Sequence, residues 1–193
     1  MVVIVALAIG LALAIQQWFV KPFQIPSGSM IPTLDIDERV LVNRFSHVMG
    51  GDPDIGDIVV FNPPVTAEMD YSGPRCTAMP NRPDTVCPEP DPRKSDDNFI
   101  KRVVAGPGDR LRIENGHPVV NGEIAEENFI RPCRGLGDCN LREEITIPPD
   151  HYFMMGDNRG ASQDSRFWGP VPRDWIIGEA FFTYWPIDKV GLF

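Results

Sequence analysis

Histidine is scarce in this chain of 193 residues, which contains only three, His47, His117 and His151. None of them lies in a motif typical of a catalytic triad, and no pair has the spacing of metal ligands. The sequence therefore gives no reason to expect histidine-based catalysis, and we expect no metal and no other cofactor.

The chain also lacks a block of charge of one sign. Its 27 acidic residues outnumber 18 basic ones and are scattered, which gives a net charge of -9 and a pI near 4.8. Binding to a phosphate backbone needs clustered positive charge. We therefore expect no nucleic-acid partner.

Polar side chains are absent from the first 15 residues, and the apolar run resumes at 18–20 after Gln16 and Gln17. A membrane-spanning helix needs about 20 mostly apolar residues, so we interpret 1–20 as an uncleaved transmembrane anchor. No basic segment precedes the run, although Ala12-Leu13-Ala14 matches the small-x-small pattern of a cleavage site. A cleaved signal peptide and a buried core helix are the two alternatives.

The four cysteines show no Cys-x-x-Cys spacing. Cys133 and Cys139 enclose a glycine-rich loop, and Cys76 and Cys87 bracket a stretch rich in proline and asparagine. This arrangement predicts two local disulfides and an oxidising compartment, with four free thiols as the alternative. Lys21 alone weakly favours a cytoplasmic side for the rest of the chain. We give the cysteines more weight and expect an extracytoplasmic domain.

Prolines and glycines, 20 and 17 in number, punctuate short apolar runs, a pattern typical of strands joined by tight turns. The dipeptides Asn115-Gly116 and Asn121-Gly122 are hairpin signals. The expected strands are 39–43, 58–61, 99–104, 110–113, 151–155 and 180–185. The proline-rich stretch 63–97 is expected to be a loop-like insertion. We therefore predict an all-β domain of antiparallel sheets over residues 21–193.

Ser29 is a candidate nucleophile because it lies in a Pro/Ser/Gly-rich elbow directly after the apolar segment. Gly28 permits a tight backbone there, and the Ser29 N–H together with the Ser27 hydroxyl could form an oxyanion hole. A serine hydroxyl needs a base to become a good nucleophile. The alternative is that the segment is a simple turn.

Lys101 is the candidate base because apolar residues flank the Lys101-Arg102 pair on both sides. Strand alternation places the two cations on opposite faces. If one faces the core it must be the lysine, since an arginine cannot readily lose its proton. A lysine base needs its pKa lowered by about three units from about 10.4, roughly 4 kcal/mol, which burial can supply. A solvated edge-strand pair is the alternative.

The polar stretch 156–166 has the composition of a long loop. Within it, Ser162 could donate a hydrogen bond that orients a neutral lysine. Asp164 and Arg166 could pair and make the loop rigid.

Four segments together resemble the bacterial type I signal peptidase family. In order along the chain they are PSGSMIPTL at 26–34, GDIVVF at 56–61, KRVVAGPGD at 101–109 and GDNRGASQDSRFWGPVP at 156–172. The resemblance runs from the apolar segment to about Pro172, with 63–97 and the stretch between the third and fourth segments outside it. It implies a serine/lysine dyad endopeptidase with Ser29 as nucleophile and Lys101 as general base. It also implies Ser27 in the oxyanion hole and Ser162 positioning the lysine.

The resemblance further implies cleavage of signal peptides from exported preproteins at small-x-small sites. The expected location is the bacterial plasma membrane, crossed once. The expected partners are signal peptides, membrane lipid and the secretion machinery. The substrate is expected to lie as a strand along the Ile100 side, with shallow apolar pockets that admit alanine. Candidates for these pockets, each of which could instead be plain core, are Phe23, Ile25, Pro26, Met30, Leu34, Val60, Phe99 and Ile100.

Two other functions are alternatives to signal peptide cleavage. A self-cleaving serine/lysine peptidase of the repressor type would need a DNA-binding domain where the apolar segment stands. A membrane-tethered β-domain that only binds exported proteins predicts that Ser29 and Lys101 are dispensable.

Overall fold

The structure, a computed structural model, describes residues 1, 3–5, 7, 10, 19–45, 50–68, 92–133 and 139–193. Most of the predicted anchor at 1–20 therefore lies outside the described residues. Within the described residues, none of the helices has the length and hydropathy that a transmembrane span requires.

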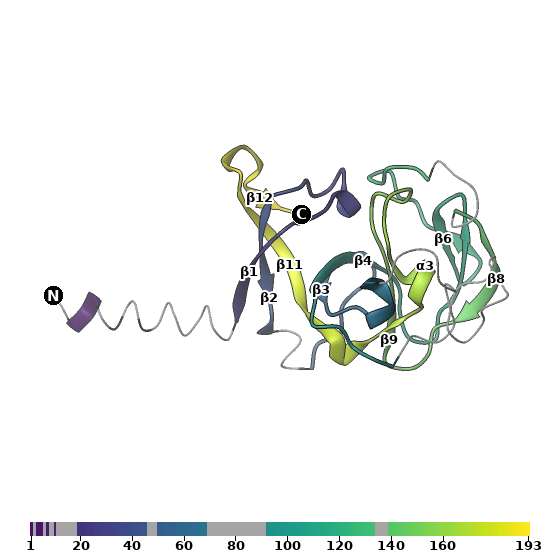
Figure 1. The fold of residues 1–193 in the computed structure, drawn as a ribbon, viewed down its shortest axis with the longest axis horizontal. Coiled ribbons are helices and arrows are strands. Elements are labelled where there is room, and N and C mark those ends of the chain that lie inside the picture. Colours follow the sequence, from purple (N-terminus) through teal and green to yellow (C-terminus); the bar gives the residue numbers. More distant parts are fainter. Residues whose placement is uncertain are drawn as a thin grey trace.

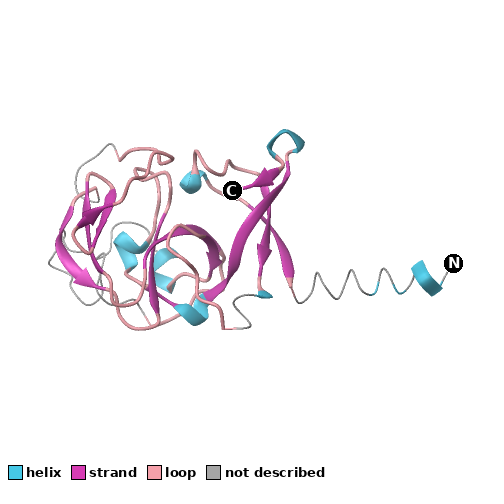
Figure 2. Cartoon of the chain, turned by 180° about the vertical axis from the view of Figure 1, so that it is seen from behind, coloured by secondary structure: helices cyan, strands magenta, loops and turns pink. Residues whose placement is uncertain are grey.

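The described chain is built from antiparallel strands, with helical segments of only three or four residues between them (Figure 2). This confirms the predicted all-β fold. The larger sheet contains β1 (Val20–Gln24), β2 (Arg39–Asn43), β3 (Ile58–Phe61), β4 (Phe99–Ala105), β9 (His151–Met155), β10 (Val171–Pro172), β11 (Ile176–Trp185) and β12 (Gly191–Leu192). The smaller sheet contains β5 (Arg110–Glu114), β6 (His117–Val120), β7 (Glu123–Ile124) and β8 (Leu141–Thr146).

Strand order in the larger sheet departs from chain order. The order is β1-β2-β11-β3-β4-β9-β10, with β12 paired to β11, so the late strand β11 separates β2 from β3. β1, β2 and β12 lie at one end of the molecule and the smaller sheet at the other, with β3, β4 and β9 between them (Figure 1). β4 pairs with β3 on one side and with β9 on the other, and so lies between an early and a late segment of the chain.

The smaller sheet, ordered β7-β6-β5-β8, contains both predicted hairpins. Asn115 and Gly116 join β5 to β6 with φ of 52° and 83°, and Asn121 and Gly122 join β6 to β7 with φ of 54° and 92°. Two-residue turns with both φ values positive match the right-handed twist of the flanking strands. Asparagine and glycine are the residues that adopt this conformation most readily.

The helical segments are the 3₁₀ turns η1 (Gly28–Met30), η2 (Val65–Glu68), η3 (Arg173–Trp175) and η4 (Ile187–Lys189), and the α-helical turn α3 (Ser165–Trp168). η2 lies within the predicted insertion, and Ala67 in it is buried. Pro64 and Lys94 form an isolated bridge, so the two ends of the insertion are held side by side. Residues 69–91, with Cys76 and Cys87, lie outside the described residues.

β3 lies between two apolar clusters, and all four of its residues are buried. Val59 and Phe61 pack in a cluster with Val103 and Trp168, whereas Ile58 and Val60 pack in a second cluster with Met30. Because successive strand side chains point to opposite faces, a run of four apolar residues fits a strand covered on both sides. β4 pairs with this buried strand, and all of its residues except Phe99 and Arg102 are buried as well.

Candidate active site

Ser29 lies in η1, the tight turn that follows β1, and is buried apart from 6% of its surface. Its carbonyl oxygen accepts a hydrogen bond from Asn158 N at 3.0 Å, and Asn158 Nδ2 donates to Gly28 O at 2.9 Å. The Ser27 hydroxyl lies 3.4 Å from Ser29 Oγ. One asparagine therefore fixes the backbone of the turn that presents Ser29.

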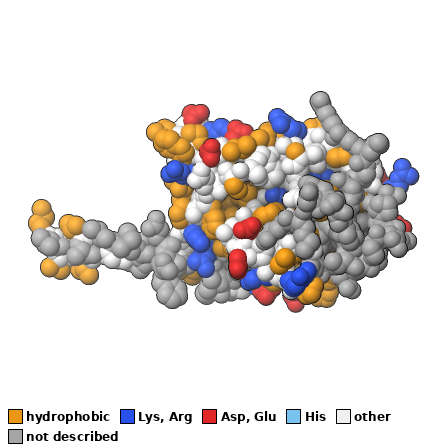
Figure 3. All heavy atoms as spheres, in the orientation of Figure 1, with side chains coloured by type: hydrophobic (Ala, Val, Ile, Leu, Met, Phe, Trp, Pro, Cys, Tyr) orange, Lys and Arg blue, Asp and Glu red, His pale blue; other side chains and the backbone are white. Residues whose placement is uncertain are grey.

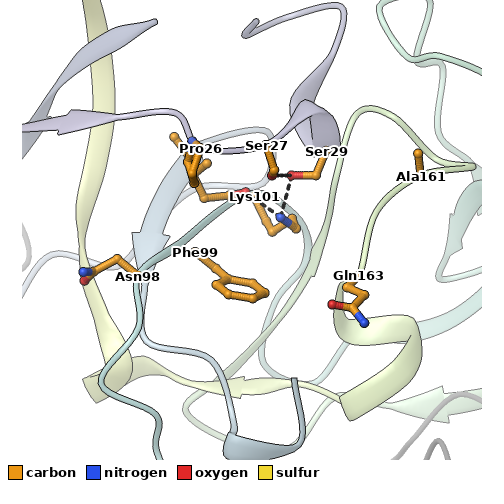
Figure 4. A pocket seen from close by; sticks show the side chains of 9 residues that line it. Pro26, Ser27, Ser29, Asn98, Phe99, Lys101, Ala161 and Gln163 are labelled. Atoms are coloured by element: carbon orange, nitrogen blue, oxygen red, sulfur yellow. Dashed lines mark hydrogen bonds between the residues drawn. The ribbon is translucent and has the colours of Figure 1, made fainter. Parts of the chain in front are cut away.

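Lys101 projects from β4 toward Ser29, 72 residues distant in the chain. Its Nζ donates to Ser29 Oγ at 2.8 Å and to Ile100 O at 2.9 Å (Figure 4). Lys101 is opposite Val59 in the pairing with β3, and only 3% of its surface is exposed. The amine also lies 5.2 Å from the centre of the Phe99 ring. Lys101 is thus held in an apolar setting with its amine against the serine hydroxyl.

The protonation state of Lys101 is set mainly by this burial, which lowers the pKa of Lys101 from 10.5 to about 8. Asp164 acts in the opposite direction, Arg166 lowers the pKa further, and Asp157 raises it. Burial outweighs the attraction of the two carboxylates. A useful fraction of Lys101 is therefore neutral near pH 8, where it can accept a proton.

Arg102 is on the other face of β4, opposite Ile58 in the register. Its Nε lies 2.9 Å from Asp157 Oδ1 and its Nη2 lies 2.7 Å from Asp157 Oδ2, the fork geometry of a strong arginine–carboxylate pair. The guanidinium also lies 4.3 Å from the centre of the Phe129 ring. Arg102 therefore anchors Asp157, the neighbour of the asparagine that holds Ser29.

The polar stretch 156–166 is turned inward, although its composition suggested a long loop. Asp164 pairs with Arg166, with Nε–Oδ1 and Nη2–Oδ2 distances of 2.7 and 2.8 Å, and accepts from Gly156 N at 3.0 Å. Burial opposes ionisation of Asp164, but the charge of Arg166 and the hydrogen bonds that the carboxylate accepts together outweigh burial and hold the pKa of Asp164 below its usual range. The buried polar residues of the stretch are Asp157, Asn158, Arg159, Ser162, Asp164, Ser165 and Arg166.

Ser162 is buried close to the dyad without a direct bond to it among the described contacts. Its hydroxyl lies 3.5 Å from Gln163 O and also hydrogen-bonds the Asp164 carboxylate. A Cβ on Gly156 would stand 2.2 Å from Ser162 Oγ and 2.5 Å from Ser29 O, so only glycine fits there. Gly156 thereby lets the loop approach the nucleophile closely.

An open cleft of about 340 Å³ lies beside the dyad (Figure 4). Three of the predicted pocket residues, Pro26, Phe99 and Ile100, line it. The other five pack together in the apolar cluster beside β3 instead, namely Phe23, Ile25, Met30, Leu34 and Val60. Their side chains help to support the cleft from within the core.

Asn98, Ala161 and Gln163 also line the cleft and were not among the predicted residues. The roles of Asp157 and Asn158 were missed as well, although both stand in the fourth segment quoted above. Their charge and amide groups, in a stretch rich in small residues, were the available signal. Their partners are distant in sequence, however, and only the fold identifies them.

The structure joins Cys133 to Cys139 by a disulfide, with the two Cα atoms 5.8 Å apart. His117 lies 3.5 Å from Glu127, and His151 Nδ1 lies 2.7 Å from Pro149 O. Neither of these two histidines lines the cleft that holds Ser29 and Lys101. His47 lies outside the described residues.

A family profile described as signal peptidase, peptidase S26, matches residues 1–185. The chain belongs to this family. Among its relatives, a probable signal peptidase I-2 of Synechocystis sp. is 36% identical over 187 residues, which cover 96% of this chain and 72% of the relative. A signal peptidase I of Leptolyngbya laminosa is 34% identical over 97% of this chain and 79% of its own length. The chain is therefore a serine endopeptidase of the signal peptidase I class.

A crystal structure of a signal peptidase I from Enterococcus faecalis is similar as well. It is 21% identical, with a TM-score of 0.41, and the match covers 66% of this chain and 96% of that chain.

Proposed function

We propose that the chain cleaves signal peptides from exported preproteins with Ser29 as nucleophile and Lys101 as general base. Membership of the signal peptidase family supports signal peptide cleavage. The observation that carries the assignment of the dyad is the 2.8 Å hydrogen bond between Lys101 Nζ and Ser29 Oγ. A base must lie within such reach of the proton it accepts.

The proposed reaction begins with neutral Lys101 taking the proton from Ser29 as Oγ attacks the scissile carbonyl carbon. The resulting oxyanion is stabilised by the Ser29 N–H and the Ser27 hydroxyl, which stands 3.4 Å from Ser29 Oγ. Protonated Lys101 then gives its proton to the leaving amine, and the amide bond breaks to form an acyl-enzyme. A water molecule, deprotonated by Lys101, attacks this ester and frees Ser29.

Ser162 is proposed to position Lys101 through Asp164. The Ser162 hydroxyl bonds the Asp164 carboxylate, which raises the pKa of Lys101 against the effect of burial. Asp164 is itself fixed by Arg166 and by Gly156 N. This arrangement supports a fixed lysine whose pKa stays near the working pH.

The shape of the cleft supports a substrate with small side chains near the cut. Pro26, Phe99 and Ile100 give it an apolar lining next to the dyad. An apolar pocket of limited size accepts alanine and excludes larger groups by steric conflict. We therefore propose small-x-small sites as the substrate sequence.

Attachment to a membrane, with the catalytic domain on the extracytoplasmic side, is also part of the proposal. The apolar run 1–20 would be the anchor, with the secretion machinery close by. Large apolar side chains are exposed near the C-terminal tip, with Ile187 77% and Leu192 78% exposed, and Figure 3 shows hydrophobic atoms gathered there. Phe19 and Phe45, 41% and 47% exposed, contact each other beside β1. These groups favour contact with lipid.

The test uses Ser29→Ala and Lys101→Ala in the full chain, with a purified preprotein as substrate. Each variant is expected to lose processing while its circular dichroism spectrum and thermal transition stay cooperative. Glu123→Lys, an exposed change on β7, serves as the control and should process the preprotein normally. Normal cleavage by either dyad variant would disprove the assignment.

A further inference from the structure

The cleft holds a polar side chain, Gln163, that the proposed mechanism does not use. Gln163 lines the same cleft as Ser29 and Lys101, and Figure 4 shows its carboxamide beside the opening. A carboxamide has two N–H donors and one acceptor oxygen. Within the described part of the chain, the Gln163 carboxamide makes no hydrogen bond, whereas the Gln163 backbone oxygen accepts from the Ser162 hydroxyl.

The backbone that carries Gln163 is fixed by the residues on either side. Ser162 and Asp164 are 4% and 0% exposed, and Asp164 forms the bidentate pair with Arg166. Gln163 itself is only partly buried. The Gln163 side chain therefore faces the cleft from a fixed backbone, which lowers the entropy cost of contacting a ligand.

The position of Gln163 relative to the dyad indicates which part of a substrate it meets. Figure 4 shows Asn98 and Pro26 on one side of the Ser29–Lys101 pair, and Ala161 and Gln163 on the other. The apolar lining residues Pro26 and Phe99 lie on the Asn98 side, so the small residues that precede the scissile bond of the proposed substrate belong there. Once the scissile carbonyl carbon is at Ser29 Oγ, the chain after that bond continues toward Ala161 and Gln163.

We infer that Gln163 is a substrate-contacting residue that meets the first two residues of the mature protein, directly after the scissile bond. This inference rests on the proposed function. A neutral carboxamide that both donates and accepts is compatible with mature chains that begin with either charge. Gln163 would thus keep the enzyme tolerant of many exported proteins.

The inference is tested by reversing charge on both partners. Peptides with one small-x-small site carry Lys, Gln or Glu at the first or second position after the scissile bond, and kcat/KM is measured for the wild type, Gln163→Glu and Gln163→Lys. We expect the glutamate variant to prefer Lys-bearing peptides and the lysine variant to prefer Glu-bearing ones, each by about threefold or more, the scale of partly exposed ion pairs. The wild type should differ little among the three.

Two further variants locate the effect. Asn98→Lys, on the opposite side of the cleft, should alter preference at positions before the scissile bond and leave the mature side unchanged. Glu123→Gln makes the same change of one positive unit far from the cleft and should alter neither. If Gln163→Lys does not fold, Gln163→Glu with the Lys and Glu peptides remains decisive.

The outcomes separate this inference from the proposed function. Cleavage by the wild type without a crossover in the Gln163 variants, or with a crossover only before the scissile bond, overturns the inference alone. No cleavage of any peptide or preprotein by the wild type overturns both.

Discussion

The two faces of β4 carry neighbouring cations, Lys101 and Arg102, that have different hydrogen-bond partners. On one face, Lys101 is buried with a serine hydroxyl and a carbonyl oxygen as its hydrogen-bond partners. On the other, the Arg102 guanidinium meets both oxygens of Asp157. A buried lysine can lose its charge, whereas an arginine stays charged and serves as an ion-pair partner.

Lys101 and Arg102 therefore have different roles in β4. Burial without a direct carboxylate partner lowers the pKa of Lys101 to about 8 and suits it to proton transfer. On the other face, the ion pair with Arg102 holds Asp157, next to the Asn158 that binds the Ser29 turn. One face of β4 supports the chemistry, and the other fixes the geometry that the chemistry needs.

The largest effect on activity is expected when the lysine and the arginine are each replaced by the other cation. Lys101→Arg keeps the charge but cannot supply a neutral base, so we expect kcat/KM to fall by about a thousandfold. Arg102→Lys keeps a cation for Asp157 and should retain most activity. Initial rates on one peptide substrate measure both, and similar losses in the two variants would contradict a special role for the Lys101 face.

Titration of stability sharpens the same contrast, with an expected effect of about 3 kcal/mol. The pKa of Lys101 is 10.5 when unfolded and about 8 when folded, so the unfolded chain binds more protons between those values. Stability should therefore rise as pH increases from 8 to 10.5, and the full cost of the buried charge is present below pH 8. Urea unfolding of the wild type and Lys101→Met measures this, and parallel pH profiles would refute it.

Removing the carboxylate on the Arg102 face should have a smaller effect on stability. Asp157→Asn leaves Arg102 without its ion pair and is expected to lower the free energy of unfolding by about 2 kcal/mol, since Arg102 is partly exposed. The loss should shrink when Arg102→Met is already present, because no cation is then left unpaired. Additive losses in this double-mutant cycle, measured by chemical denaturation, would show that the pair is not coupled.

The smallest effect is expected at Asn158, which connects the Arg102–Asp157 pair to the turn that carries Ser29. Asn158→Ala removes the bond to Gly28 O, and we expect a loss of about 1 kcal/mol of stability and about a tenfold fall in kcat with little change in KM. Asn140→Ala is the matched control, since Asn140 accepts from the Asn115 backbone far from the site. A fall in kcat of equal size in both variants would contradict a positioning role for Asn158.

Local features of the fold could be predicted from the sequence, and distant pairings could not. The strands expected at 39–43 and 58–61 coincide with β2 and β3, and both Asn-Gly hairpins are present, because alternation and turn chemistry act within a few residues. β1, with a proline and two polar residues among its five, forms through its pairing with β2. The insertion of β11 between β2 and β3 depends on packing across the whole chain.

The site shows the same division. Lys101 could be singled out because it stands among apolar strand residues and cannot share a face with Arg102. Nothing local in the sequence showed that Asn158 would bind the Gly28 carbonyl, or that Gln163 would face the cleft. Met30 and Leu34 were predicted to line a pocket but lie in the core. The sequence does not distinguish the two places, because an apolar side chain fits a core and a pocket equally well.

The most direct test of the central claim, that Lys101 is a base whose neutral form is accessible, is an NMR titration of its side chain. The ε-carbon signal is assigned by its loss in Lys101→Arg and followed from pH 6 to 11 in the full chain. We predict a midpoint near pH 8. A midpoint near 10.5, the value for a solvated lysine, would contradict it.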